Sequence, residues 1–338
     1  MNKTLIIEIL KQIGHAVCDK VYASVNQHDV EHMSKVHHEG EDDTIYQIDK
    51  DVEDIIVPML NLHARSLGGI VLLAEGIGDP LHGMVLPSEL NAKSAALRII
   101  IDPIDGTRGI MYNKRPGFFL AGVAANHGVE TTLNDIVLAV MTELPISKNY
   151  TSDTLWTTRG HKPHAERRNL ITNVVKKLEL KPSKSNTILG GYAQLARFFP
   201  PGRDILSKIE DELIETLFSA QLQSGRAIVF EDQYISTGGQ LYEMLMGHDR
   251  FIADLRPLLY KKLFGSGTKP GHVCHPYDAC TFLIGHEAGL IFTDGYGNSF
   301  DAPMDLLSDV SWCAYANRHI CDEVQPHLQK LVHKYLTV

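Results

Sequence analysis

Long apolar segments are missing from this 338-residue sequence. No run approaches the ~20 apolar residues that a membrane-spanning helix needs, so we predict no association with a membrane. The apolar stretch near the N-terminus is interrupted by Glu8 and followed by Lys11. This pattern predicts an amphipathic helix, because a signal peptide needs a longer uninterrupted apolar core and a cleavage site.

Cysteine and positive charge are also scarce. The five cysteines form an odd, scattered set, which predicts reduced and mostly buried thiols in a cytoplasm. Lys and Arg number 32 against 41 Asp and Glu, a net charge of −9. A mildly acidic chain is a poor candidate for binding a nucleic-acid polymer or an anionic membrane surface. It can still bind a small phosphate ester, provided that metal ions offset the repulsion.

The composition is that of an ordinary globular protein, with 44% hydrophobic and 22% charged residues. Its length suffices for two modest domains or one large α/β body. The polar segment 181–186 is the best linker, so we predict an N-terminal α+β part at 1–184 and a C-terminal α/β part at 185–338.

Periodicity and turn residues predict the secondary structure. They predict helices at 4–25, 51–65, 204–219 and 278–288 and a loop at 29–44. They also predict antiparallel strands at 118–124, 136–142 and 155–158, and further strands at 227–230 and near Ile188.

The segment 98–109 carries most of the functional information. An isoleucine run at 99–101 predicts a strand that delivers Asp102 to its end, where Pro103 stops the strand. Asp105 follows three residues later, so two carboxylates flank a proline-containing turn and can face one point. Such oxygens are the ligands that Mg²⁺ prefers. A simple Asp-rich turn is the ordinary alternative, but the isoleucine run before it favours a metal site.

The same turn offers backbone groups for an anion. Gly106 and Thr107 offer backbone N–H groups at a predicted helix start, which suits a phosphate. The Ile104 carbonyl lies between the two carboxylates, and the Thr107 hydroxyl can orient a water molecule. Two further acids end or begin comparable segments: Glu75 follows an apolar run, and Asp278 precedes a predicted helix. Alone, Asp278 would be interpreted as a helix cap and Glu75 as a surface acid.

The segment Asp102–Thr107 resembles the signature of the inositol monophosphatase family. That family belongs to the lithium-sensitive, magnesium-dependent phosphomonoesterases, together with fructose-1,6-bisphosphatases and 3′(2′),5′-bisphosphate nucleotidases. Three more family elements are matched in order, at 48–53, at 74–76, and at 277–279 with 287–289. The resemblance implies an α/β fold, a layered αβαβα sandwich with the site in the cleft between its two parts, and a homodimer.

The resemblance also implies a set of metal ligands. One ion would be held by Glu75, Asp102 and the Ile104 carbonyl, which makes Glu75 catalytic as well as a ligand. A second ion would be held by Asp102, Asp105 and Asp278. The implied cofactor is Mg²⁺, two or three ions per site, with Mn²⁺ as a possible substitute and Li⁺ as an inhibitor.

Roles in the reaction follow from the same resemblance. Asp49 and Thr107 would hold and deprotonate the attacking water. Asp105 and the amides of Gly106 and Thr107 would hold the phosphate. The sequence departs from the family at Gly76, where a second glutamate is usual. Whether a third ion binds is therefore left open.

The residues that contact the rest of the substrate are harder to identify. Arg108 follows the signature directly, where bisphosphate nucleotidases have lysine, and could contact a second phosphate or be a solvated surface group. Ser236, Thr237 and Gly238 are candidates for the rim that holds the leaving group, although small residues at a helix start also serve as caps. Asp254 could accept a hydrogen bond from a substrate hydroxyl, or be an ordinary acid at a strand end.

Three functions therefore compete. The leading hypothesis is a Mg²⁺-dependent phosphomonoesterase acting on an inositol phosphate or a sugar or polyol phosphate. The alternative is a 3′(2′),5′-bisphosphate nucleotidase, motivated by Arg108. A catalytically silent relative that binds metal or phosphate is the third, motivated by Gly76 and by an apparent insertion at 256–273, ahead of Asp278.

Overall fold

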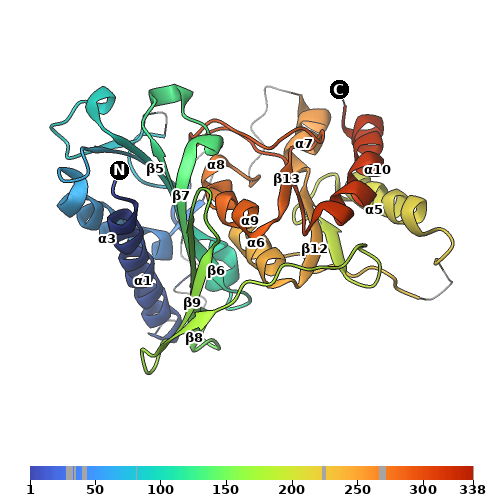
Figure 1. Cartoon of the computed structure of the whole chain (residues 1–338), viewed down its shortest axis with the longest axis horizontal. Helices are drawn as coiled ribbons and strands as arrows, with labels where there is room; N and C mark the ends of the chain where they lie inside the picture. Colours follow the sequence, from blue (N-terminus) through green and yellow to red (C-terminus); the bar gives the residue numbers. More distant parts are fainter. Residues whose placement is uncertain are drawn as a thin grey trace.

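The computed structural model describes residues 1–27, 33, 36–39, 44–80, 82–222, 226–265 and 272–337, with the backbone alone for 36–39, 44–51 and 53. Figure 1 shows five layers, in the order helices, sheet, helices, sheet, helices. The layered αβαβα sandwich that we predict is therefore confirmed. No helix in these ranges is both long and apolar enough to cross a membrane.

The large sheet has eight strands in the order β10-β9-β8-β7-β6-β5-β3-β4. Their bounds are β3 Ile70–Ala74, β4 Met84–Leu86, β5 Leu97–Asp105, β6 Gly117–Ala125, β7 Ile136–Leu144, β8 Thr151–Thr158, β9 His164–Asn169 and β10 Val175–Leu178. β3 and β5 are parallel, and β6, β7 and β8 are antiparallel neighbours, as predicted. All nine residues of β5 are buried, because helices cover both faces of the sheet.

Helices enclose the large sheet on both sides. On one face lie α1, Lys3–Gln27, and α3, Gln47–Ala64, whose buried apolar residues form one core with that face. On the other face lie α6, Thr237–Met246, α8, Pro276–Ala279, and α9, Phe282–Ala288. The short helix α4, Thr107–Met111, begins just after β5. The carboxyl end of β5 is thus placed between α4 and α8.

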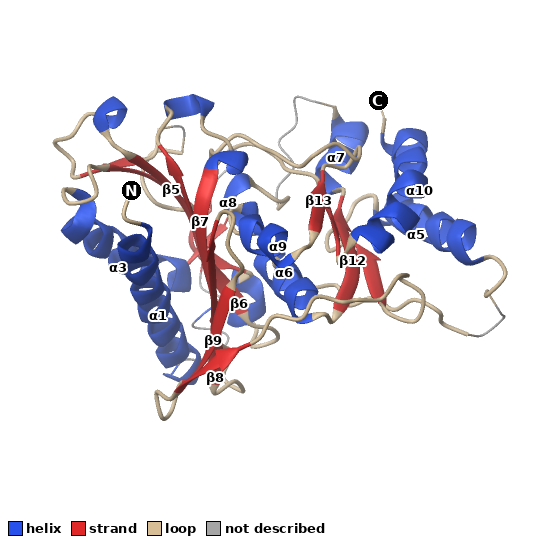
Figure 2. Cartoon of the chain, viewed as in Figure 1, coloured by secondary structure: helices blue, strands red, loops and turns tan. Residues whose placement is uncertain are grey.

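The small sheet has the order β11-β12-β14-β13, and three helices form the last layer beside it (Figure 2). The bounds are β11 Tyr192–Leu195, β12 Asp249–Asp254, β13 Ile291–Thr293, β14 Trp312–Tyr315, α5 Arg203–Phe218, α7 Arg256–Phe264 and α10 Arg318–Leu336. One apolar core joins the inner face of the large sheet, the middle helices and the small sheet. The large sheet ends at 178 and the small one begins at 192, so the division at 184/185 falls between them and stays a prediction.

Two predictions of secondary structure are wrong, the loop at 29–44 and the strand near Ile188. The segment 29–44 is not all loop, because its residues Val36–Glu39 form β1, which pairs with β2, Thr44–Tyr46. Most of the rest of that segment lies outside the described residues. Ile188 lies in a loop, where its N–H donates to the Glu323 carboxylate at 3.0 Å rather than to a neighbouring strand.

Two more local predictions need correction. The segment 227–230 is irregular, with only an isolated bridge between Phe230 and Tyr192. The single helix predicted at 278–288 is divided into α8 and α9 at Thr281, whose φ of −101° and ψ of 6° depart from helical values. Apolar periodicity continues across both helices, which is why the sequence pattern does not reveal the break.

Glu143, near the end of β7, is a half-buried acid. Its Oε2 accepts a hydrogen bond from the Asp153 N–H at 3.3 Å. Burial, and after it the charge of Asp153, raises the pKa of Glu143 to about 8. The folded protein therefore holds a proton there over a pH range in which the unfolded chain releases it.

We expect Glu143→Gln to increase the free energy of unfolding at pH 8.5 by on the order of 2 kcal/mol. Between the ordinary carboxyl pKa and about 8, the folded state binds the extra proton, so wild-type stability falls as pH rises. The variant lacks this cost, and its advantage should vanish at pH 5. Urea denaturation at both pH values measures the difference, with Glu215→Gln on the exposed face of α5 as control. An equal effect at both pH values would contradict the assigned pKa.

Candidate active site

A bulge in β5 brings Asp102 and Asp105 together. Asp102 pairs with Leu120 and Asp105 with Phe118, so three steps along β5 match two along β6. In a regular strand, residues three apart point to opposite faces, and one extra residue places them on the same face. The prediction that Pro103 stops the strand is therefore wrong. Pro103 lies inside β5, within the bulge. Its missing N–H is tolerated there because the ladder is already interrupted.

Glu75 lies beside Asp102 because β3 and β5 are parallel neighbours. Ala74 is in register with Ile101, and the Glu75 N–H donates to the Ile101 carbonyl at 3.3 Å. The next residue on each strand is thus an acid, at the same edge of the sheet. A hydrogen bond between the two side chains acts on the pKa of Asp102. The register of two parallel strands accounts for a pair of acids 27 positions apart in the chain.

Asp278 reaches the same point from the second half of the chain. It is the third residue of α8, and its Oδ2 accepts the His275 N–H at 2.6 Å in a capping box. Asp278 is therefore the third helical residue of a capping box whose cap is His275, and it is also a member of the cluster. Ligand atoms of Asp102, Asp105 and Asp278 all lie within 4.8 Å of one another. The two predicted turn carboxylates do converge, and they are joined by the third acid.

The cluster concentrates negative charge in a buried place. Burial, and after it the charges of Asp105 and Asp278, holds the pKa of Asp102 well above its usual range. Burial also raises the pKa of Asp105 to about 6, although hydrogen bonds from Ser236 and Gly238 oppose this. A divalent cation would remove the repulsion and favour the ionised forms. Mg²⁺ needs few protein carboxylates because it keeps several waters, so this donor set fits it.

The start of α6 holds Asp105 in position. The Ser236 hydroxyl donates to Asp105 Oδ2 at 2.7 Å, the Gly238 N–H donates to Oδ2 at 2.5 Å, and the Thr237 N–H donates to Oδ1 at 3.3 Å. Ser236 also caps the helix, since its Oγ accepts the Gly239 N–H at 2.8 Å. These three residues, predicted as a rim for the leaving group, all donate hydrogen bonds to the Asp105 carboxylate, a candidate metal ligand. A Ser-Thr-Gly-Gly helix start is the signal that could have indicated this.

We expect Ser236→Ala to weaken binding of Mg²⁺ by about tenfold and to lower stability by about 1–2 kcal/mol. The variant removes a hydrogen bond to a buried carboxylate and the cap of α6 together. Isothermal titration with Mg²⁺ and urea denaturation measure the two effects. Thr216→Ala, which removes an exposed hydroxyl from α5, should change neither. Unaltered affinity for Mg²⁺ in Ser236→Ala would show that Asp105 is held without this hydroxyl.

The turn after Asp105 is shaped by glycine. Gly106 has φ 88°, and a Cβ there would lie 3.0 Å from the Ser236 Cβ. The Thr107 hydroxyl donates to the Ile104 carbonyl at 2.8 Å, so its oxygen remains able to accept. Asp49 lies in the first turn of α3, and its side chain is outside the described residues. The roles predicted for Asp49, Ile104, Gly106 and Thr107 stay predictions.

Arg108 is part of a chain of contacts that crosses to the second half. Its Nη2 lies 3.3 Å from His272 Nε2. The His272 carbonyl accepts from Arg256 Nη1 at 2.6 Å, and Arg256 packs over the Phe198 ring with 4.6 Å from Cζ to the centroid. Two basic side chains, Arg108 and His272, are thereby held beside the signature turn. Residues 266–271 of the apparent insertion lie outside the described residues.

Asp254 ends β12 and is paired inside the protein, which favours the second of its two predicted roles, an ordinary acid at a strand end. It is 0% exposed, and its two oxygens accept from Arg256 Nε at 2.9 Å and Nη2 at 2.5 Å. A substrate hydroxyl cannot reach this carboxylate while it is fully buried. We therefore assign Asp254 the structural role of holding Arg256.

Asp309 is a further neighbour of the cluster, and no sequence motif points to it. His275 lies between two acids, with Nδ1 3.8 Å from Asp278 Oδ2 and Nε2 3.9 Å from Asp309 Oδ1. Its ring stacks on Tyr277, whose hydroxyl lies 3.1 Å from Nδ1. Asp309 belongs to no motif and is 31 positions from Asp278, so only the fold brings it to the site.

Solved structures of three proteins share this fold. Extragenic suppressor protein SuhB from Bartonella henselae is 16% identical with a TM-score of 0.63, over 96% of this chain and 99% of that one. Fructose-1,6-bisphosphatase from Leishmania major is 13% identical with a TM-score of 0.64, over 96% and 94%. Inositol monophosphatase from Anabaena is 13% identical with a TM-score of 0.57, over 99% and 97%. No protein-family model matches the sequence, and no curated protein does.

These likenesses extend over nearly the whole length of each chain. At 13–16% identity they show the fold. The predicted sandwich of the inositol monophosphatase and fructose bisphosphatase type is thus confirmed in architecture.

Proposed function

We propose that this chain, which has the fold of inositol monophosphatases and fructose-1,6-bisphosphatases, is a Mg²⁺-dependent phosphomonoesterase of a reducing cytoplasm. Its substrate is an inositol phosphate or a sugar or polyol phosphate. The observation that carries the proposal is the meeting of three acids from distant parts of the chain, Asp102, Asp105 and Asp278, within 4.8 Å. The five cysteines are all free and buried, in keeping with a reducing compartment.

The acids would hold the metal ions. Asp102 is central, since it is in contact with Glu75 on one side and in the cluster with Asp105 and Asp278 on the other. The Ile104 carbonyl completes the set. When bound, the ions lower the pKa of water and neutralise charge that develops on the phosphoryl and leaving oxygens. Hydrogen bonds from α6 hold Asp105 in the geometry that this requires.

Thr107 would orient the attacking water. Its hydroxyl proton is committed to the Ile104 carbonyl at 2.8 Å, so the Thr107 oxygen can accept but not donate. A water bound there points one O–H at Thr107 and its lone pairs elsewhere, toward the phosphorus. Asp49 would accept the proton that this water loses. The phosphate would be bound by Asp105 through a shared ion and by the amides of Gly106 and Thr107.

A panel of phosphate esters, assayed by release of inorganic phosphate, tests the proposal. It includes inositol 1-phosphate, sugar and polyol monophosphates and adenosine 3′,5′-bisphosphate, each with Mg²⁺, with Mn²⁺, with added Li⁺ and with chelator. We expect Mg²⁺-dependent turnover of a polyol or sugar phosphate, partial support by Mn²⁺ and inhibition by Li⁺. Absence of any Mg²⁺-dependent turnover that Asp102→Asn abolishes would favour a silent metal- or phosphate-binding protein.

One observation favours a second candidate, a 3′(2′),5′-bisphosphate nucleotidase. Arg108 and His272 are 3.3 Å apart beside the signature turn, and a second phosphate could bind between them and the cluster. Hydrolysis of adenosine 3′,5′-bisphosphate without hydrolysis of inositol phosphates would decide for it. We also propose a homodimer, on the resemblance to the family alone, which sedimentation equilibrium tests.

A further inference from the structure

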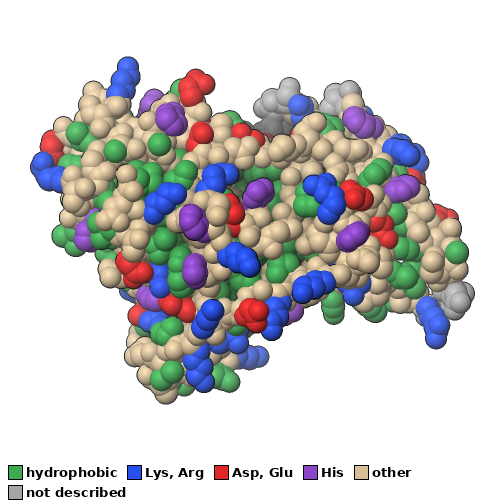
Figure 3. Space-filling view, in the orientation of Figure 1, with side chains coloured by type: hydrophobic (Ala, Val, Ile, Leu, Met, Phe, Trp, Pro, Cys, Tyr) green, Lys and Arg blue, Asp and Glu red, His purple; other side chains and the backbone are tan. Residues whose placement is uncertain are grey.

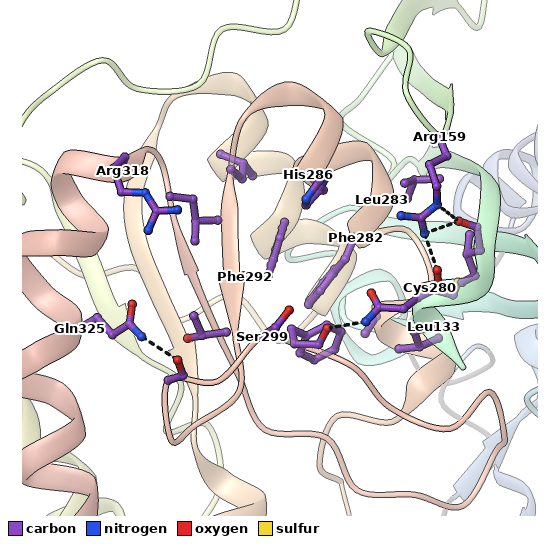
Figure 4. Close-up of a pocket in the computed structure, with 18 residues that line it drawn as sticks. Leu133, Arg159, Cys280, Phe282, Leu283, His286, Phe292, Ser299, Arg318 and Gln325 are labelled. Carbon is purple, nitrogen blue, oxygen red and sulfur yellow. Dashed lines mark hydrogen bonds between the residues drawn. The ribbon is translucent and has the colours of Figure 1, made fainter. Parts of the chain in front are cut away.

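A cavity of about 430 Å³ lies behind the turn that carries Asp278. Ala279 and Cys280, the two residues after Asp278, form part of its wall. Residues of α9, β13 and α10, the segment 133–136, Arg159 and the loop 297–300 form the rest. Figure 4 shows the residues around it. The volume is in the range of sites for small organic ligands. None of the acids assigned to the metal cluster lines this cavity.

Stacked aromatic rings form one wall of the cavity. Phe292 stacks on Phe282 with 4.5 Å between centroids and 21° between the ring planes, and the Phe300 centroid is 5.2 Å from that of Phe282. Gly285 makes this possible, because a Cβ there would lie 2.6 Å from the Phe292 ring. Such a wall offers a flat apolar surface for another ring.

The Lys, Arg, His, Asp and Glu residues of the lining are all of the basic type. They are Arg159, His286 and Arg318, and the described lining contains no Asp or Glu, in a chain whose net charge is −9. Arg159 and Arg318 lie on opposite sides of the rings in Figure 4. Arg159 donates to two backbone carbonyls, which do not neutralise its charge. The acid paired with Arg318, Asp322, is 3.9 Å away and solvent-exposed. Around the middle of the face in Figure 3, over α8 and α9, basic and His side chains are interspersed with acids.

The loop on one side of the cavity is held in place by α10. Gln325 Nε2 donates to the Gly297 carbonyl and Gln329 Nε2 to the Tyr296 carbonyl, both at 2.8 Å. The Asp294 side chain accepts the N–H groups of Tyr296 and Asn298 at 2.9 and 2.8 Å. The cavity is therefore preformed and does not depend on a ligand to create it.

We propose that this cavity binds a small flat anion, an aromatic or heterocyclic ring that carries a carboxylate, sulfonate or phosphate group. The ring packs against Phe292, and the acidic group lies toward Arg318 at the rim. A neutral ring of the same size loses the charge interaction, and an acidic peptide lacks the flat ring. The site is separate from the metal cluster, and its occupancy does not depend on turnover.

Binding of 2-naphthalenesulfonate, followed by isothermal titration with Mg²⁺ present, tests the proposal, with 2-naphthylmethanol as the neutral comparison. Arg318→Gln removes the rim charge, and Lys330→Gln removes an exposed charge elsewhere on the same helix as its matched control. Ser299→Trp places a large side chain at an exposed position of the cavity mouth. Asp102→Asn disables the metal cluster without touching the cavity.

We expect saturable binding of one sulfonate per chain to the wild type, Lys330→Gln and Asp102→Asn alike. Arg318→Gln and the neutral analogue should each bind about fivefold more weakly, a typical effect of one exposed charge. Ser299→Trp should abolish binding. No saturable binding to wild type, equal binding by the neutral analogue, an Arg318→Gln effect no larger than that of Lys330→Gln, or binding retained in Ser299→Trp would each overturn the proposal. Loss of binding in Asp102→Asn would place the probe in the metal cluster and overturn it as well.

Discussion

Replacing Asp102 with asparagine is expected to lower phosphatase activity by about 10³-fold or more while stabilising the metal-free protein. Asp102 is in contact with Glu75 and clustered with Asp105 and Asp278, so its loss disturbs every ion the site would hold. Removal of one preorganised electrostatic contact commonly costs about 10²–10³-fold, and a ligand shared between ions should cost at least the upper value. Initial rates with the best ester of the panel measure the loss.

The effect of Asp102→Asn on stability depends on whether the metal is present. The pKa of Asp102 is well above its usual range, because burial and then the nearby carboxylates oppose its ionised form. In the metal-free wild type, the folded state therefore binds a proton more readily than the unfolded chain, and stability falls as pH rises above the ordinary carboxyl pKa. The neutral amide of the Asp102→Asn variant has no such cost, so we expect a gain on the order of 1 kcal/mol at pH 7.5 with chelator.

Added Mg²⁺ should raise the melting temperature of the wild type and leave that of Asp102→Asn nearly unchanged. The shift for the wild type should shrink as pH falls through about 6, where Asp105 becomes protonated. Differential scanning fluorimetry from pH 5 to 8 measures this, with Asp211→Asn on α5 as a charge-matched control. A Mg²⁺ response of Asp102→Asn equal to that of the wild type would rule out Asp102 as a ligand.

Asp254→Ala should reduce the free energy of unfolding by about 3–5 kcal/mol. Asp254 forms an ion pair with Arg256, and both side chains are nearly inaccessible to water. Removing the acid leaves a buried guanidinium whose charge is uncompensated. Urea denaturation with an unchanged m-value measures the loss.

The double variant Asp254→Leu with Arg256→Met separates two roles for this pair. It removes both charges, so it should recover much of the stability that Asp254→Ala loses. If Asp254 only holds Arg256, turnover of folded protein should change little in kcat, and any effect should appear in KM through His272 and Arg108. A severe loss of kcat with stability restored would favour the other role that the sequence leaves open for Asp254, a contact with the substrate.

The parts of the site predicted well are those that lie next to each other in the chain. Ile99 to Thr107 combine a buried strand, two carboxylates and a glycine at the turn, and local rules apply to each. Even there, the sequence pattern suggests that Pro103 ends β5, whereas pairing with β6 continues to Asp105 through a bulge. A bulge depends on the partner strand, which no local pattern contains.

The contacts predicted least well depend on side chains that are far apart in sequence. Ser236 lies 131 positions from the Asp105 carboxylate that it holds, and both its alternatives, a cap and a substrate contact, are compatible with the local sequence. Asp254 and Arg256 are only two residues apart, yet nothing local indicates that both are buried. Burial follows from the layers that cover them.

The layered αβαβα class and the ligand roles of Glu75 and Asp278 are implied by the resemblance to a known family. By itself, the sequence determined the three antiparallel strands after the signature turn and the pair of acids, Asp102 and Asp105, that could hold metal. These depend on periodicity, turn chemistry and ligand type, which are local properties of the chain. Only the tertiary structure decided that Asp278 meets Asp102 and Asp105, that α6 holds Asp105, and that Asp254 is an internal partner of Arg256. The reason is physical: position in space, burial and the resulting pKa values arise from packing between segments, and separation along the chain does not set them.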